Sequence, residues 1–390
     1  MLTLSRKIIT FSALYLAFVT IGLISNMAGP MMPHLKNILE LNSMQTGMLI
    51  SSNFAGMIIA VIFGGVIADI TGKKRFLTAA SVIVFLAMIM AVLSSGYLML
   101  LSALIINGIG FGMFEVGINS YAVDFCRENR LSAEKNLNII HFFFGIGAIV
   151  SPLVVKFSLG TMDYTLIFKL IMISAFSTAV ILFFSSETVY GSDRRNLSDT
   201  FKFLVSQKLL WIAGVLVFLY VGIEVTSYGW LPEFWNKTVN AEYISAPVTA
   251  SVFWGALTFG RLISAFVTEK LGNRLYMLLS AGLLVLTAGL WNILYNEISL
   301  IFLVIVIGLL LSGLFPAIIN LSQKNNEGNS AVITSFVLIF ASIGGSVVPV
   351  IAGGMVDIKG IMAVPAVITV TSLMFLLAAF YYSRFSKEND

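Results

Sequence analysis

The amino-acid sequence predicts an all-α membrane protein that crosses the bilayer twelve times. Three observations support this prediction. The 390 residues are 58% hydrophobic and only 11% charged, whereas soluble domains carry about 25% charged residues. Apolar runs of about 20 residues, the length that a helix needs to cross a bilayer, recur along the chain. Glycine, which is frequent in membrane helices, accounts for 32 residues.

One long polar connection divides the expected spans into two groups of six. It covers residues 187–208 and separates an N-terminal six-helix bundle at 1–186 from a C-terminal one at 209–390. The first apolar run is long enough to span and lacks a clear small-x-small cleavage site, so we interpret it as an uncleaved helix. The expected spans lie near residues 8–31, 45–70, 76–95, 97–124, 137–159, 164–186, 209–234, 247–270, 274–295, 298–321, 330–356 and 361–384.

Lysine and arginine concentrate on one side of these spans. With the N-terminus inside, 17 of the 23 basic residues fall in inner segments and 5 in outer ones, while Arg261 falls within a span. Basic residues gather on the cytoplasmic side of membrane proteins. The asymmetry therefore predicts that both termini are cytoplasmic.

The composition also limits the function. A single cysteine, Cys126, excludes an intramolecular disulfide, and two histidines argue against a histidine-based metal cluster. The pattern Gly108-x-Gly110-x-Gly112 lacks the strand–turn–helix context of a dinucleotide site, so helix packing explains it better. No phosphate-binding loop and no catalytic triad is readable. We expect no cofactor, no enzymatic activity and no nucleic-acid partner, and we expect a monomer in the lipid bilayer.

The two halves resemble each other at an offset near 200 residues. VTIGLIS at 19–25 aligns with LYVGIEV at 219–225, and IGAIVSP at 146–152 aligns with IGGSVVP at 343–349. Parallel repeats of this kind place their binding site near the membrane midplane, at the interface between repeats. The same offset brings three inner-loop residues, Asp69, Gly72 and Lys74, over Glu269, Gly272 and Arg274.

The loop GGVIADITGKKR at 64–75 resembles the signature that the major facilitator superfamily carries between its second and third helices. That signature is Gly-x-x-x-Asp-Arg-x-Gly-Arg/Lys-Arg/Lys, and Ile70 replaces its first arginine here. The matching residues are Gly65, Asp69, Gly72, Lys73 and Lys74.

A carboxylate at one helix end and cations at the next can hold the inner face of a transporter shut. We therefore predict a cytoplasmic gate. A positive-inside loop with a turn glycine is the alternative, and it accounts for the lysines but not for Asp69. The predicted gate residues are Asp69, Lys73 and Lys74 in the first half, and Glu269 and Arg274 in the second.

Further stretches, including FEVGIN at 114–119, FWGALTFGR at 253–261 and GGSVVPVIAGGMVD at 344–357, are similar to the fucose–proton symporter family. That family includes proton-coupled bacterial glucose/mannose permeases, so the resemblance implies a proton-coupled sugar symporter. One region departs from it. The fucose permease has a carboxylate just before a Pro-His pair, whereas no acid precedes Pro33-His34 in SNMAGPMMPHLK at 25–36.

Glu115 lies near the middle of an otherwise uncharged run, where a carboxylate costs about 2.5–3.5 kcal/mol on insertion scales. Asn107, Phe111, Glu115 and Asn119 recur every four residues and therefore share one helix face. We interpret Glu115 as a proton carrier that faces a central cavity beside Asn119, a candidate for substrate binding. The alternative is a protonated glutamate that a neighbour satisfies.

Glu224 is the second deep acid of the sequence. Tyr220 and Tyr228 lie four residues to either side of it. This mixture of phenol and carboxylate groups suits a sugar, whose hydroxyls need polar partners and whose C–H face stacks on aromatic rings. We assign Glu224 to proton coupling and Tyr228 to substrate binding. The alternative is an interfacial aromatic belt, to which Trp235 belongs.

Five more polar or aromatic residues are candidates. Arg261 should have an acid or a row of carbonyls as its partner, although snorkelling toward the inner face is the alternative. Trp254 lies on a helix face similar to that of Arg261 and is a candidate for substrate contact. Asn26 and Asn320 could bind sugar hydroxyls or bridge helices. For His141 the family resemblance implies substrate contact or a place in the proton path, and a structural role near its helix end is the alternative.

We therefore predict a secondary transporter of the cell membrane that couples proton entry to hexose uptake by alternating access. A proton-exchanging exporter of drugs or metabolites is the alternative, but its site should be mostly apolar. A transport-inactive receptor or scaffold would not need two deep acids, and a membrane enzyme would need a nucleophile–base pair. Sodium could replace the proton, and several hexoses or a small glycoside would fit.

Overall fold

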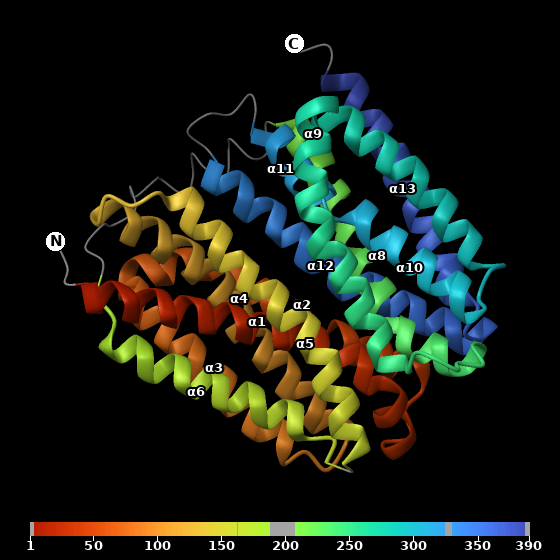
Figure 1. Ribbon diagram of the computed structural model, residues 1–390, viewed down its shortest axis with the longest axis horizontal. Helices are drawn as coiled ribbons and strands as arrows, with labels where there is room; N and C mark the ends of the chain where they lie inside the picture. The colour runs from red at the N-terminus through yellow and green to blue at the C-terminus, as the bar shows by residue number, and fades with distance from the viewer. Residues whose placement is uncertain (1–3, 162, 188–206, 324–329, 387–390) are drawn as a thin grey trace. The chain divides into compact units, whose positions relative to one another are not determined.

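The computed structural model describes residues 4–161, 163–187, 207–323 and 330–386, which form helices and connecting loops without any strand (Figure 1). The chain divides into two units. Unit 1 comprises Met1–Leu41 and Ser52–Asp193, and unit 2 comprises Asn42–Ser51 and Arg194–Asp390. Most of the predicted linker, residues 188–206 of 187–208, lies outside the described residues. The all-helical prediction is confirmed for the described part of the chain.

Helices α1 to α6 build unit 1, except for the first turns of α2. In this unit α1 packs against α5 and α6, and α3 packs against α4 and α6. Their bounds are α1 (Leu4–Ile38), α2 (Ser43–Thr71), α3 (Lys73–Val92), α4 (Tyr97–Glu128), α5 (Ala133–Gly160) and α6 (Leu166–Phe184).

Glycine permits two of the closest helix contacts in unit 1. A Cβ at Gly22 of α1 would meet the backbone of Phe144 and Ala148 on α5, and a Cβ at Gly108 of α4 would meet the backbone of Asn53 on α2. Without Cβ atoms the helix backbones approach directly, which is how small residues drive helix association in membranes.

Helices α8 to α13 build most of unit 2. In this unit α8 packs against α12 and α13, and α9 packs against α10 and α13. Their bounds are α8 (Lys208–Thr238), α9 (Ala246–Trp291), α10 (Glu297–Leu311), α11 (Leu314–Gln323), α12 (Ser330–Lys359) and α13 (Ala363–Ser386).

The structure joins and divides some predicted spans. The expected spans 247–270 and 274–295 form one element, α9, that is interrupted at Gly272, where φ is 77° and the backbone is not helical. The expected span 298–321 is divided into α10 and α11 at Ser312 and Gly313. When α9 is counted as one helix and Glu297–Gln323 as another, the described residues contain eleven helices that are long and apolar enough to cross a membrane.

The beginning of α2 belongs to unit 2. Asn42 Oδ1 accepts from Gln45 N at 2.8 Å and Gln45 Oε1 accepts from Asn42 N at 3.0 Å, so the two residues form a reciprocal capping box. Asp357 of α12 supplies a second cap, because its carboxylate accepts from Ser43 N at 2.8 Å and Met44 N at 2.9 Å. The cap ties the first turn of α2 to the end of α12.

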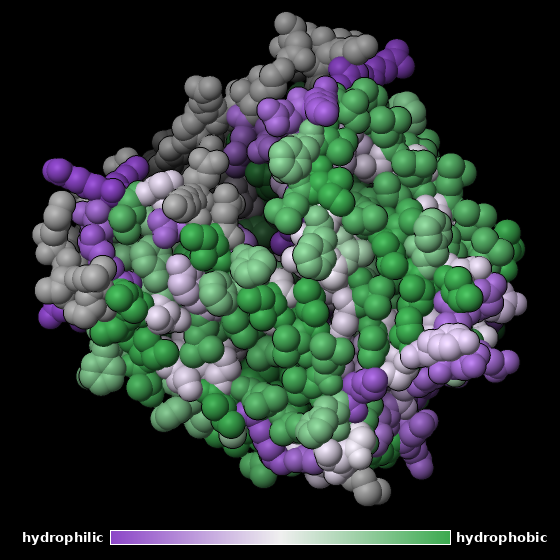
Figure 2. All heavy atoms as spheres, in the orientation of Figure 1, coloured by the Kyte–Doolittle hydropathy of each residue, from purple (hydrophilic) through white to green (hydrophobic). Residues whose placement is uncertain are grey.

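Apolar side chains cover most of the helix sides that Figure 2 shows, and hydrophilic ones gather toward the helix ends. In unit 1, for example, Phe183 is 73% exposed and Phe157 is 65% exposed. Exposed side chains of this kind fit helices whose outer faces contact lipid rather than water.

Candidate functional site

In unit 1 the structure brings together three of the predicted site residues. Asn119 Nδ2 donates to the backbone carbonyl of Glu115 at 2.7 Å, and Asn119 Oδ1 lies 3.2 Å from His141 Nε2. Since an amide oxygen can only accept, this contact requires a proton on Nε2 of His141. The His141 ring also packs edge-on against Phe18, with centroids 4.8 Å apart. The contact between Asn119 and His141 links α4 to α5.

Glu115 lies one helical turn from Asn119, and its side chain is half-buried. It therefore shares a helix face with the amide that contacts His141. This arrangement places a carboxyl group, an amide and an imidazole within one polar cluster on α4 and α5. Such a cluster can hold a proton and can donate to or accept from a hydroxyl.

A second polar cluster in unit 1 is buried between helices. Asn107 Nδ2 donates to Asn53 Oδ1 at 2.9 Å, and Asn53 Nδ2 donates to the carbonyl of Ile24 at 3.4 Å. These amides connect α4, α2 and α1, as intramembrane amides often do. Asn26 is fully buried nearby along α1, and its Nδ2 donates to Gly22 O at 3.2 Å.

In unit 2 the buried acid Glu224 has two polar neighbours. Tyr220, one turn earlier on α8, forms a hydrogen bond with the Glu224 side chain, and the positive charge of Arg261 on α9 attracts it. Glu224 itself is only 9% exposed. A carboxyl group that can either pair with a guanidinium or accept a proton is therefore placed on α8.

An aromatic surface continues along α8 one turn beyond Glu224. The Tyr228 ring lies 5.4 Å from the Trp254 ring and 6.0 Å from the Phe253 ring, centroid to centroid. Tyr220 meets Phe315 of α11 at 6.0 Å. Two predicted substrate residues, Tyr228 and Trp254, are thus in direct contact. A third, Asn320, lies exposed on α11.

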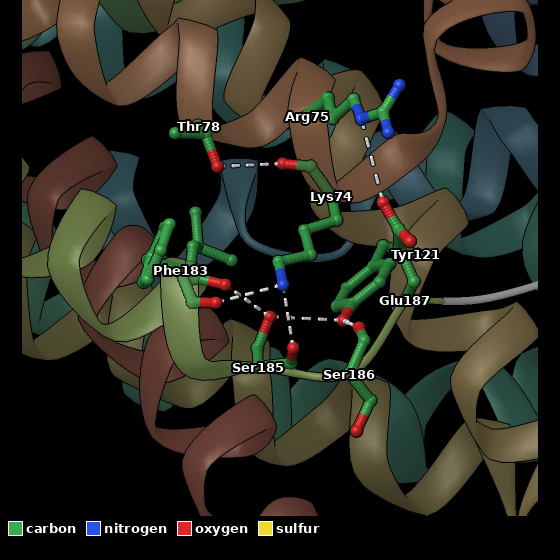
Figure 3. Close-up of polar contacts among 9 residues, drawn as sticks. Lys74, Arg75, Thr78, Tyr121, Phe183, Ser185, Ser186 and Glu187 are labelled. Atoms are coloured by element: carbon green, nitrogen blue, oxygen red, sulfur yellow. Dashed lines mark hydrogen bonds and ion pairs between the residues drawn. The ribbon is translucent and has the colours of Figure 1, made fainter.

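The predicted gate lysines contact groups that the sequence did not indicate. Lys73 Nζ pairs with Asp124 of α4, and both side chains are nearly buried, at 10% and 12% exposed. Lys74 Nζ donates to the carbonyls of Phe183 at 3.0 Å and Ser185 at 2.8 Å, at the end of α6 (Figure 3).

In unit 2 the matched cation, Arg274, donates from Nε to Ser383 Oγ on α13 at 2.9 Å. The two predicted gate acids, Asp69 and Glu269, both lie on exposed positions. These contacts of the gate cations lie within each unit, to α4, α6 and α13.

Sequence reasoning missed Asp124 and Asn53. Asp124 directly follows the apolar run that holds Glu115, and an acid near a lysine-rich loop is itself a pairing signal. Asn53 is the lone asparagine in the apolar run of α2. The reasoning that singled out Asn26 applied equally to Asn53.

Comparison with known proteins identifies the family. Residues 14–349 match the Major Facilitator Superfamily. The chain belongs to this superfamily. It is 24% identical to the glucose/mannose transporter GlcP of Bacillus subtilis (strain 168) over 387 residues, which cover 96% of this chain and 95% of the relative. It is also 24% identical to a glucose/galactose transporter of Brucella abortus over 367 residues, which cover 90% and 88%.

The fold is similar to that of a solved fucose:proton symporter, FucP of E. coli. The TM-score is 0.68 at 18% sequence identity, and the match covers 97% of this chain and 99% of FucP. The resemblance read from the sequence motifs is therefore confirmed. The protein is a multi-pass membrane protein of the cell membrane, with the fold of the superfamily's transporters.

Proposed function

We propose that this protein is a proton-coupled hexose symporter that works by alternating access. The observation that carries the proposal is the match to a glucose/mannose transporter over 96% of the chain, together with polar and aromatic clusters that suit a sugar. A glucose/galactose transporter matches nearly as much of the chain. Both relatives are named as hexose transporters, but the two names give different pairs of hexoses. We therefore propose a hexose as the substrate and do not specify which one.

Each unit offers groups that suit a sugar. Tyr228 and Trp254 offer aromatic faces for the C–H surface of a sugar ring, and Asn119 and His141 offer groups that can donate to or accept from hydroxyls. Sites of this kind place a few polar groups on a mostly apolar wall. Asn26 and Asn320 stay candidates on the sequence argument, for a conformation in which they reach the sugar.

Proton coupling would rest on the two deep acids. Glu115 shares its helix face with Asn119, which contacts His141, and Glu224 has a hydrogen bond from Tyr220 and feels the positive charge of Arg261. Ionisable groups inside a membrane are costly and mark proton and substrate pathways. We assign the coupling proton to Glu115, and we propose that Glu224 exchanges between its proton and Arg261.

The proposed topology has twelve spans with both termini in the cytoplasm. Helix α9 is 46 residues long, so an unbroken helix would measure about 69 Å, more than twice the bilayer core of about 30 Å. The break at Gly272 would therefore separate two spans, and α10 with α11 would form one. The 17-to-5 distribution of basic residues sets the orientation.

The proposed gate lies at the cytoplasmic ends of α2 and α3 and at the matched point of α9. Asp69 and Glu269, with Lys73, Lys74 and Arg274, would stabilise the outward-open state by contacts at the closed inner face. Because Lys73 and Lys74 each also contact groups within unit 1, their charges are already oriented before the gate closes.

Transport assays on the purified protein would test the proposal. Proteoliposomes are loaded with buffer at pH 7.5 and diluted into labelled hexoses at pH 6.0, with equal-pH vesicles and a sodium gradient as parallel arms. We expect glucose or a related hexose to accumulate under the pH gradient alone. Accumulation under sodium alone would reassign the coupling ion, and hexose-independent proton flux with drug export would favour the exporter.

A further inference from the structure

A cavity of about 320 Å³ opens in unit 1 where α3 begins and α6 ends. It is lined by the side chains of Lys74, Arg75, Thr78, Phe183 and Glu187 (Figure 3). Two of these residues are cationic and one is a large aromatic residue. Only Lys74 belongs to the proposed gate, and none belongs to the sugar and proton clusters.

The ammonium group of Lys74 is fixed at the wall of this cavity. It donates to the carbonyls of Phe183 and Ser185, at a helix end where backbone carbonyls lack helical partners. An ammonium group has three N–H donors, so one remains for a ligand. Tyr121 also donates to the carbonyl of Ser186, which holds the chain after α6 in place.

The second cation, Arg75, is held only weakly. Its Nε lies 3.6 Å from Glu187 Oε1, and the two side chains are 77% and 60% exposed. Exposed ion pairs of this kind contribute little to stability. A phosphate could displace Glu187, because a guanidinium binds phosphate oxygens through two parallel N–H donors.

The cavity borders an exposed apolar seam between α3 and α6. The two helices pack together through Phe85 and Phe176, whose ring centroids lie 5.7 Å apart. Exposed apolar side chains on these two helices include Val82 and Leu86 on α3, and Ile173, Phe176, Phe183 and Phe184 on α6. Cationic and apolar surfaces thus meet at one point on the bilayer-facing side of unit 1.

We propose that this cavity binds the phosphate head group of an anionic phospholipid, with the acyl chains along the α3–α6 seam. Basic pockets between membrane helices suit such head groups. Unit 2 provides an internal comparison. Its matched positions hold Arg274, which donates to Ser383, and Leu275 in place of Arg75. The paired cations are therefore a property of unit 1.

Native mass spectrometry of the full-length protein in detergent would test this site. The ligands are phosphatidylglycerol, phosphatidylethanolamine with the same acyl chains, and soluble glycerol 3-phosphate. We expect phosphatidylglycerol to be retained preferentially. Arg75→Gln keeps both carbonyl contacts of Lys74, and it should weaken phosphatidylglycerol binding about five-fold, the contribution of one basic side chain near an anionic head group.

Two further variants make the outcome specific. Arg384→Gln removes an equal charge from an exposed position at the end of α13 and should leave binding unchanged. Glu187→Gln removes the carboxylate that occupies Arg75 and should strengthen phosphatidylglycerol binding. Equal retention of the two phospholipids, no change in either Arg75→Gln or Glu187→Gln, or displacement of lipid by glycerol 3-phosphate would overturn the proposal.

Discussion

Units 1 and 2 share a glycine turn at matched positions, but the charged residues around the turn differ. Gly72 and Gly272 both have positive φ, 87° and 77°, and open space where a Cβ would lie. Lys73 follows Gly72 and pairs with Asp124, whereas the neutral Asn273 follows Gly272. Both halves of the repeat contain this turn, which only glycine adopts without strain. The charges beside the turn differ between the two units.

The deep acids diverge in the same way. Glu115 lies on α4, and its matched position in unit 2 is Phe315. Glu224 lies on α8, and its matched position in unit 1 is Ile24. Glu115 and Glu224 therefore lie on helices that the repeat does not relate. This asymmetry indicates that the two acids have separate roles, and the following predictions test that difference between the units.

The largest expected effect concerns the two acids. Glu115→Gln mimics the protonated carboxyl permanently, so gradient-driven accumulation of sugar should be abolished while sugar binding and equal-pH counterflow persist. Glu224→Gln should impair both accumulation and counterflow, because it leaves the charge of Arg261 without its acid. The measurement compares accumulation under an inward pH gradient with counterflow at equal pH.

The outcome assigns the coupling acid. A Glu115→Gln protein that still accumulates sugar would move the coupling proton to Glu224. Loss of binding in Glu115→Gln would instead make Glu115 a direct ligand of the sugar. Asp163→Asn, an exposed substitution in the loop between α5 and α6, serves as the matched control that should transport normally.

The next prediction concerns the ion pair between Lys73 and Asp124 in unit 1, whose lysine is replaced by Asn273 at the matched position of unit 2. Asp124→Asn leaves Lys73 nearly buried without its carboxylate, and it should destabilise the protein by about 3 kcal/mol, since removing one partner of a buried ion pair is costly. Adding Lys73→Asn copies the neutral residue of unit 2 and should restore most of the loss. Heating followed by size-exclusion chromatography measures the stability, and a double variant no better than Asp124→Asn would contradict this reasoning.

A smaller effect compares matched glycines, Gly22 on α1 and Gly222 on α8. A Cβ at Gly22 would meet backbone atoms of α5, whereas a Cβ at Gly222 would lie 2.5 Å from Cγ2 of the Val348 side chain. Side chains can shift where packed backbones cannot. Gly22→Ala should cost about 1–3 kcal/mol, the usual range for overpacking, and Gly222→Ala should cost less. The same heating assay ranks them, and equal losses would refute the comparison.

The smallest effect concerns Asp163 in the loop between α5 and α6 of unit 1. At the offset that aligns IGAIVSP with IGGSVVP, its matched residue in unit 2 is Gly360. The hydrogen bond from Lys169, at 2.7 Å, and that from Thr165 hold the pKa of Asp163 below its ordinary value. A lowered folded-state pKa stabilises the protein above the unfolded pKa of about 4 and ceases to do so as the pH falls. The wild-type protein should be slightly more stable than Asp163→Asn at pH 7. This difference in stability should vanish below about pH 3.

Parts of the candidate site could be predicted from the sequence because a polar group in an apolar run stands out. Glu115, Asn119, Glu224 and Tyr228 were found in this way, and helical periodicity correctly placed Asn119 one turn from Glu115. Contacts between distant segments could not be predicted. Nothing in the spacing of residues indicates that Lys73 meets Asp124, because that pairing depends on how α3 lies along α4.

An all-helical membrane protein could be predicted from the sequence alone, because each long apolar run satisfies its backbone hydrogen bonds in lipid by forming a helix. Its motifs also determined the superfamily. Which polar groups meet across helices depended on the three-dimensional packing: Asn119 with His141, Lys73 with Asp124, and Lys74 with the end of α6. Helix packing sets these contacts through side chains that lie far apart along the chain, so no local pattern of residues can specify them.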